Sequence, residues 1–209
     1  MLEFRKDIVA LLDTNVLYPM ALCDLLLTLA EDLSGFYAPR WSADILEELR
    51  RNLVADGRCT PTQALRRLQL MNDAFPEALV EDYERLVPAM QNDDNDRHVL
   101  AAAVRGDCRF IVTHNTRHFP SAATLPYDIR PVSPDQFLQE IFTHGSAESI
   151  LPMIIMNQAN SLRRPELTVR HVLNALSQQI PETVKQMRSH FEGYGLMDVI
   201  HQPGDVQGT

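Results

Sequence analysis

Short apolar runs alternate with helical patterns over the first two-thirds of the chain. Residues 8–12 (IVALL) form a continuous apolar run, typical of a parallel strand that is covered on both faces, and residues 109–113 (RFIVT) indicate a second buried strand. Apolar residues at helical spacing follow each run, the first from Leu17 onward. Strands and helices alternate through about residue 143, which favours an α/β/α sandwich with a central, mainly parallel sheet.

Capping signals mark where several helices begin. Residues 60–63 (TPTQ) form a capping box with proline at the first helical position, and residues 133–136 (SPDQ) repeat that chemistry. Ser42 offers an N-cap to a helix with an apolar stripe. A short helix over residues 99–104 can end at Gly106. Residues 78–90 suit a helix except for Pro88, so their structure stays open.

After residue 143 only helical patterns remain. They cover residues 150–159, 169–176 and 181–191, and residues 144–146 (HGS) offer a hinge before them. We therefore expect an α/β domain over residues 1–143, a small α-helical C-terminal domain over residues 144–201, and a disordered tail over residues 202–209.

Composition and charge narrow the class of protein. The three cysteines are widely scattered and lack a CxxC pair, which excludes a disulfide framework and a zinc site and favours a reducing, cytoplasmic location. The N-terminus does not resemble a signal peptide, and no apolar stretch is long enough to span a membrane. The net charge of -9 argues against constitutive nucleic-acid binding. A nuclease remains compatible with it, because negative charge can be concentrated around bound cations.

Acidic and polar residues stand where the two predicted strands end. Asp13 follows the first strand, and Thr113 and Asn115 follow the second. The loop from Asp93 to Asp96 ends at a helix N-terminus, where carboxylates are electrostatically favoured. Ligands of parallel sheets bind beyond the carboxyl ends of the strands, so these chain-distant groups are expected to meet at one edge.

The helix that Ser42 caps adds a further carboxylate. At 100° per residue, Glu48 lies roughly 115° from the centre of its apolar stripe and Glu47 about 145°, so Glu48 is nearer the protein body. Each feature also has an ordinary structural explanation: a turn with a capping aspartate at Asp13, a solvated acidic loop, or an exposed helix glutamate. Their joint order on strand ends and helix starts favours a site.

Clustered carboxylates imply a cation, because they repel one another unless a divalent ion compensates them. Oxygen ligands without a Cys/His pattern favour Mg²⁺ or Mn²⁺ over zinc, and the expected metal ligands are Asp13, Glu48, Asp93 and Asp96. A histidine site is disfavoured because no two histidines have zinc spacing. Magnesium held by a few carboxylates points to phosphodiester hydrolysis.

The same residues resemble the PIN-domain ribonucleases, specifically the VapC-type toxins of toxin-antitoxin pairs. The segments that carry the resemblance are residues 11–17 (LLDTNVL), 45–53 (ILEELRRNL), 93–104 (DDNDRHVLAAAV), 111–120 (IVTHNTRHFP) and 133–138 (SPDQFL). The resemblance implies a PIN-like fold, a Mg²⁺-dependent endoribonuclease and the toxin of a type II pair. It also implies an RNA substrate and a small cognate antitoxin, and it is compatible with a homodimer.

The resemblance assigns roles to the acidic residues. It makes Asp13 the first metal-site acid, Glu48 the second and Asp96 the third, with Asp93 a close accessory. Asn115 stands at the fourth polar position. The C-terminal helices resemble the domain appended to a longer subgroup of these toxins.

Two supporting residues and two departures follow from the same resemblance. Thr113 and Asn15 match supporting positions of the site. Asn115 stands where many members have aspartate, and His118 stands before Phe119 where aspartate is common. These departures leave open whether one or two metal ions bind.

Two other functions compete with the nuclease. A haloacid-dehalogenase-like phosphatase also begins with a strand-one aspartate, but it needs a second aspartate where this chain has Asn15. A non-catalytic module that binds RNA or a protein partner is the stronger alternative, because of Asn115 and His118. In the C-terminal part, the candidates for a basic surface are Arg163, Arg164, Arg170, Lys185 and Arg188, although solvated helix faces explain them as well.

Overall fold

The computed structural model describes residues 8–31, 36–142, 147–161 and 167–198. Five parallel strands form one sheet: β1 (Val9–Leu12), β2 (Ala38–Ser42), β3 (Leu79–Val80), β4 (Phe110–Val112) and β5 (Arg130–Val132). Their order is β3-β2-β1-β4-β5. The expected hinge at residues 144–146 and the tail at residues 202–209 lie outside the described residues.

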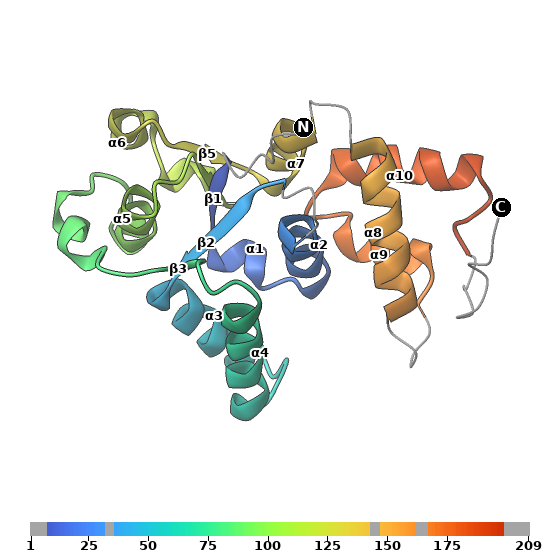
Figure 1. Ribbon diagram of the computed structural model, residues 1–209, viewed down its shortest axis with the longest axis horizontal. Helices are drawn as coiled ribbons and strands as arrows, with labels where there is room; N and C mark the ends of the chain where they lie inside the picture. The colour runs from blue at the N-terminus through green and yellow to red at the C-terminus, as the bar shows by residue number, and fades with distance from the viewer. Residues whose placement is uncertain (1–7, 32–35, 143–146, 162–166, 199–209) are drawn as a thin grey trace.

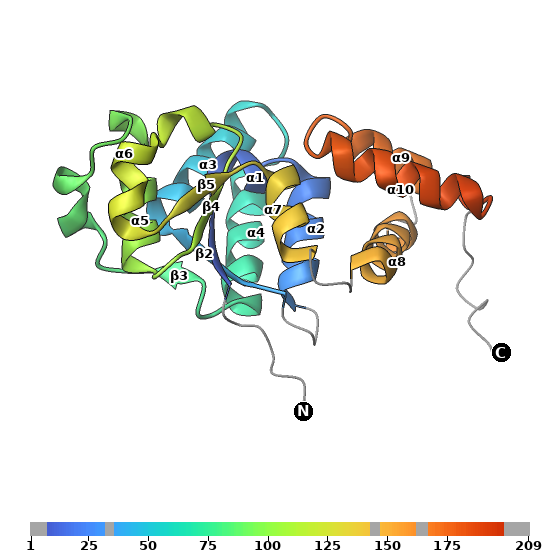
Figure 2. The same ribbon diagram turned by 90° about the horizontal axis from the view of Figure 1, so that it is seen from above.

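Helices cover both faces of the sheet, which confirms the predicted α/β sandwich (Figures 1 and 2). The α-helices are α1 (Thr14–Leu17), α2 (Met20–Glu31), α3 (Ala43–Ala55), α4 (Pro61–Ala74), α5 (Arg97–Arg105), α6 (Ser121–Thr124), α7 (Pro134–Phe142), α8 (Ala147–Ser161), α9 (Val169–Leu176) and α10 (Pro181–Gly193). Four 3₁₀ turns join them: η1 (Glu84–Ala89), η2 (Asp94–Asp96), η3 (Thr116–His118) and η4 (Leu125–Tyr127). Helix α5 lies on one face, and α2 and α7 lie on the other (Figure 2).

The core is built from the central strands and the helices that cover them. Leu11 and Ile111 are fully buried, as expected for strands with neighbours on both sides and helices on both faces. On the α7 face, Phe137 packs edge-on against Phe110 and Tyr37, with ring centroids 5.7 Å and 4.9 Å away. The core therefore fixes β4 and α7 next to each other.

The predicted caps are present. The Ser42 hydroxyl accepts a hydrogen bond from the Ile45 N–H, and Thr60 and Gln63 form the reciprocal capping box. Ser133 and Gln136 also bond each other's backbone N–H groups. These local signals were sufficient to place the starts of α3, α4 and α7.

Several boundaries differ from the sequence predictions. Residues 78–90, whose structure the sequence left open, form the short strand β3 and the 3₁₀ turn η1, which contains Pro88. The helical pattern predicted from Leu17 is split, since α1 ends at Leu17 and α2 starts at Met20 after Pro19. Strands β2, β3 and β5 were not identified, because β2 and β5 contain proline and arginine and β3 is only two residues long.

The three C-terminal helices match the predicted patterns and pack against the sheet domain. Helix α8 contacts α2, where the Gln158 amide donates to the Ala21 carbonyl at 3.2 Å, and α10 contacts α7. Ile154, Leu173 and Phe191 are buried among these helices. Figure 1 shows α8 to α10 beside α2 and α7, on the side away from α5 and α6. None of the described helices is long and apolar enough to cross a membrane.

Strand β5 forms one edge of the sheet. The Arg130 N–H donates to the Arg109 carbonyl, and the Val132 carbonyl accepts from the Thr113 N–H. Backbone groups alternate in direction along a strand, so those of Pro131 point away from β4. Proline has no N–H, and this edge therefore offers no donor at its middle residue.

Candidate active site

Asp13 and Thr113 lie side by side at the carboxyl edge of the sheet. Strands β1 and β4 are parallel neighbours with Leu12 opposite Val112, so the next residue of each strand meets its counterpart. The Thr113 hydroxyl donates to Asp13 Oδ2 at 2.6 Å, and the Asn15 amide donates to the same oxygen at 2.6 Å. The Thr14 N–H donates to Oδ1 at 2.7 Å. Three donors thus hold a carboxylate that is only 4% exposed.

Glu48 faces this carboxylate from α3. The Thr14 hydroxyl lies 3.0 Å from Glu48 Oε2 and 3.2 Å from the Ile45 carbonyl oxygen, and it can donate to either acceptor. Glu47 is exposed and pairs with Arg50 at 2.6 Å on the outer side of the helix. The structure therefore places Glu48, and not Glu47, beside Asp13.

A second group of possible metal ligands consists of Asp93, Asp96 and His118. Each of them offers a ligand atom, and these atoms lie within 4.8 Å of one another. His118 Nδ1 is 2.6 Å from Asp96 Oδ2. The Asp93 N–H donates to the His118 carbonyl, which fixes η2 against η3. Asp96 is the member of this group that also reaches the pocket described next.

A pocket of about 290 Å³ brings most of the predicted residues together. Its walls consist of Asp13, Thr14, Asn15, Tyr18, Glu48, Asn52, Asp56, Asp96 and Asn115. Three predicted residues do not line it: Thr113 lies beneath Asp13, and Asp93 and His118 lie beside Asp96. No lysine, arginine or histidine is among the lining residues.

The electrostatics of the pocket suit a divalent cation. The pKa of Asp13 is raised to about 6, mainly by burial and also by the negative charges of Asp96 and Glu48, while the hydrogen bonds from Thr113 and Thr14 lower it. Among the described residues no basic side chain lines the pocket, and the His118 ring beside it contacts Asp96. Carboxylate and amide oxygens are hard ligands, so the residues present fit Mg²⁺ or Mn²⁺.

Four lining residues were not identified from the sequence: Thr14, Tyr18, Asn52 and Asp56. Asn52 lies on α3 and Asp56 is its C-cap residue, and both follow Glu48 at steps of four residues, a helical spacing that places all three on one side of the helix. That spacing could have identified Asn52 and Asp56 from the sequence. No sequence pattern could have identified Tyr18, because its position depends on how α1 packs against α3.

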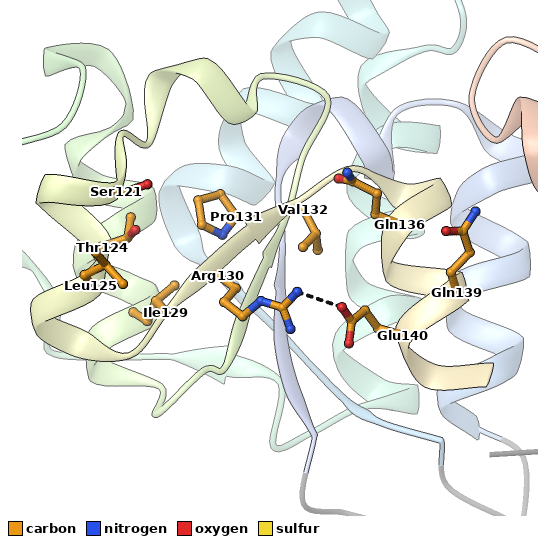
Figure 3. Close-up of a pocket in the computed structure, with 10 residues that line it drawn as sticks. All are labelled: Ser121, Thr124, Leu125, Ile129, Arg130, Pro131, Val132, Gln136, Gln139 and Glu140. Atoms are coloured by element: carbon orange, nitrogen blue, oxygen red, sulfur yellow. Dashed lines mark hydrogen bonds and ion pairs between the residues drawn. The ribbon is translucent and has the colours of Figure 1, made fainter. Parts of the chain in front are cut away.

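A larger pocket of about 560 Å³ lies at the sheet edge, between the α6–η4 segment and α7. Figure 3 shows its walls, which include Pro131 and Val132 of β5 and the ion pair between Arg130 and Glu140 at 2.7 Å. None of the predicted site residues lines it. The candidate metal-binding carboxylates line the smaller pocket, so the larger pocket volume does not mark the candidate active site.

The C-terminal helices reach the loop that carries Asn115. The side chain of Gln179, between α9 and α10, hydrogen-bonds His114, whose pKa is lowered mainly by burial. The His114 N–H donates to Asn15 Oδ1 at 2.9 Å, and Asn15 in turn holds Asp13. A chain of hydrogen bonds therefore links the extension to the first carboxylate.

The candidate basic surface of the extension is partly neutralised where the structure describes it, and Arg163 and Arg164 lie outside the described residues. Arg170 pairs with Asp198 through two hydrogen bonds of 2.7 Å, and Arg188 donates to the Asn174 amide oxygen. Both contacts are on exposed helix surfaces, where such pairs contribute little to stability. They support a solvated face over a dedicated phosphate-binding surface.

Comparison with known proteins adds two matches. A family model described as the PIN domain matches residues 9–117, which include Asp13, Glu48, Asp96 and Asn115. The protein named "Putative ribonuclease VapC50" of Mycobacterium tuberculosis (strain ATCC 25618 / H37Rv) is 38% identical over 109 residues. This alignment covers 52% of the chain and 63% of that relative, so less than two-thirds of the relative is spanned. No solved structure matches the chain significantly.

Proposed function

The chain belongs to the PIN-domain family, and from that premise we propose that it is a Mg²⁺-dependent endoribonuclease that hydrolyses RNA phosphodiester bonds. The observation that supports this best is the convergence of Asp13, Glu48 and Asp96, from three distant segments, on one pocket without a basic side chain. The similarity to a protein named as a ribonuclease points the same way. Membership in this family argues against the phosphatase alternative.

Asp13, Glu48 and Asp96 would hold the cation, with Asp93 as an accessory ligand beside Asp96 and Asn115 as a neutral oxygen donor. A bound Mg²⁺ or Mn²⁺ would supply a water of lowered pKa and positive charge for the phosphate oxygens. The pocket's own carboxylates repel phosphate, so RNA binding depends on charge compensation at these acids.

Hydrogen bonds orient the carboxylates before any ligand binds. Thr113 and Asn15 hold one oxygen of Asp13, while the Thr14 N–H holds the other. The Thr14 hydroxyl bonds Glu48, so a single residue positions two acids. Such preorganisation reduces the entropy that is lost when the reacting groups are brought together.

Cleavage of RNA by the purified chain tests this proposal, with Glu48→Gln and Glu47→Gln as a matched pair. Mg²⁺-dependent cleavage of a fluorescent RNA of mixed sequence should disappear with chelator and in Glu48→Gln. Glu47→Gln should cleave like wild type, because Glu47 lies outside the pocket and pairs with Arg50. No cleavage by wild type in either Mg²⁺ or Mn²⁺, or full activity of Glu48→Gln, would rule the proposal out.

We further propose that this nuclease is the toxin of a type II toxin-antitoxin pair, with a small cognate antitoxin as its partner. The support is the resemblance to VapC-type toxins and the match to a VapC-named relative. Expression of the chain should arrest growth, and co-expression of the short reading frame next to its gene should restore growth. Growth arrest by an Asp13→Asn variant would contradict a toxic activity that depends on this site.

A non-catalytic role in RNA or partner binding is the second candidate, and one contact favours it. Asp96 Oδ2 is engaged by His118 at 2.6 Å, so the third acid already has a partner. Asn115 also replaces a charged ligand by a neutral one. RNA binding that persists in chelator, without cleavage, would identify this second function.

A further inference from the structure

The pocket extends beyond the residues that would hold a cation. Asp56 follows Glu48 by two turns of α3, which is about 12 Å along the helix axis. Its Oδ2 accepts a hydrogen bond of 2.6 Å from the Tyr18 hydroxyl. Asn52 lies between Glu48 and Asp56, about one helical turn from each, and also lines the pocket. This end of the pocket therefore has its own set of groups.

Tyr18 gives this end an aromatic wall. It follows α1 directly, where its backbone N–H bonds the Thr14 carbonyl, and its ring packs partly against the core. The bond to Asp56 holds the other end of the side chain. A ring that is fixed at both ends loses little further freedom when a flat ligand stacks on it.

Asn52 and Asp56 give the same end hydrogen-bonding capacity. Within the described residues, no group is hydrogen-bonded to the Asn52 amide, which offers both a donor and an acceptor. The Asp56 carboxylate accepts hydrogen bonds and repels phosphate. The groups that suit it are hydroxyls and amino groups, which ribose and three of the four bases carry.

We propose that Tyr18, Asn52 and Asp56 form a subsite for the nucleoside next to the scissile phosphate. This inference rests on the proposed nuclease function and adds substrate recognition to it. The base stacks on Tyr18, donor groups of the nucleoside bond Asp56 and Asn52, and the phosphate lies toward Asp13, Glu48 and Asp96. The volume of about 290 Å³ is at the lower end of ligand pockets and suits one nucleotide, not a double helix.

Steady-state cleavage of a single-stranded twelve-nucleotide RNA in Mg²⁺ tests the subsite. Loss of base–aromatic stacking in Tyr18→Leu should raise KM by about tenfold and change kcat less. Tyr18→Phe keeps the ring and should raise KM only slightly. Tyr127→Leu is the matched control, because Tyr127 is exposed and does not line the pocket.

Mn²⁺ affinity separates the subsite from the metal site. Calorimetric titration should give the same Mn²⁺ affinity for wild type, Tyr18→Leu and Asp56→Ala. A marked loss of Mn²⁺ affinity in either variant would place these residues with the metal ligands and overturn the subsite. Unchanged KM in both variants, with active wild type, would overturn it as well.

Nucleotide binding gives a readout that does not need cleavage. Saturation-transfer NMR with the four nucleoside 5′-monophosphates in Mg²⁺ should show contact to base protons in wild type and lose it in Tyr18→Leu. Weaker binding of 2′-deoxy forms would identify ribose as the donor, and weaker binding of uridine monophosphate would identify a base amino group. If wild type does not cleave RNA, the nuclease proposal fails, and nucleotide binding alone then decides the subsite. Equal nucleotide binding by wild type, Tyr18→Leu and Asp56→Ala would overturn it.

Discussion

The Thr183 hydroxyl, at the start of α10, donates to Asp135 Oδ1 on α7 at 2.6 Å, across 48 residues of chain. The backbone N–H groups of Glu182 and Thr183 donate to the same carboxylate at 2.8 Å and 3.0 Å. The residue before α10, Ile180, has no side chain that could cap the helix. The sheet domain therefore caps a helix of the C-terminal extension.

Asp135→Ala should destabilise the protein by about 2 kcal/mol, because it leaves buried donors of α10 without a partner. Urea denaturation should show a lower midpoint with an unchanged slope. Asp198→Ala is the control, since it removes an exposed carboxylate that also pairs across the extension. Equal midpoints for the two variants would mean that the Asp135 cap contributes little.

The fragment of residues 1–143 should still fold, but with lower stability than the full chain. Its sheet and covering helices are all present, whereas α2 loses the cover of α8 and α9. Cooperative thermal unfolding at a reduced temperature is the expected result. Persistent aggregation of the expressed fragment would show that the extension is part of one folding unit.

Asp13 should make the metal-free protein less stable as pH rises from about 4 to 7. The pKa of Asp13 is about 6 in the folded state against 3.8 for an ordinary aspartate, so folding favours the protonated form. Ionisation on raising the pH through this window then costs folding free energy, up to about 3 kcal/mol. Urea denaturation at several pH values in chelator measures the slope.

Asp13→Asn is the matched variant for that measurement. It should flatten the stability profile between pH 4 and 7 and abolish RNA cleavage. At neutral pH its stability should stay close to that of wild type, because the removed charge offsets the poorer hydrogen bonds to Thr113 and Asn15. A variant with the wild-type pH slope would show that Asp13 is not the group that titrates.

Asn115→Asp should bind Mn²⁺ at least about tenfold more tightly, because one more negative charge within a few ångströms of a dication is worth more than ~1.4 kcal/mol. Asn115 lines the pocket and His118 does not. His118→Ala should therefore change Mn²⁺ affinity less, through the release of Asp96 alone. Unchanged affinity in Asn115→Asp with a large loss in His118→Ala would assign the fourth ligand position to His118.

The sequence predicted those parts of the fold that local patterns encode. Strands β1 and β4 are apolar runs, and α3, α4 and α7 start at caps. Strands β2 (APRWS) and β5 (RPV) combine proline and arginine with few apolar residues, so only their pairing with neighbours makes them strands. Such long-range pairing leaves no local signal.

The positions of the candidate site residues were predictable where one rule connected sequence with position. Strand ends placed Asp13 near Thr113, and the helix phase separated Glu48 from Glu47. Tyr18 and Asp135 show the limit of these rules. Each acts through a partner that is 38 or 48 residues away, and neither partner follows from spacing along the chain.

Pro131 affects the tendency of this protein to aggregate at high concentration. Exposed sheet edges promote aggregation because a foreign strand can add to their free N–H and C=O groups. At β5 the middle residue lacks the N–H, and the opposite edge, β3, is only two residues long. Within the described sheet, neither edge supports a long added strand. Overproduced chains should therefore resist amyloid-like stacking through this sheet. A peptide partner would have to be bound through contacts with its side chains instead of backbone pairing with a sheet edge.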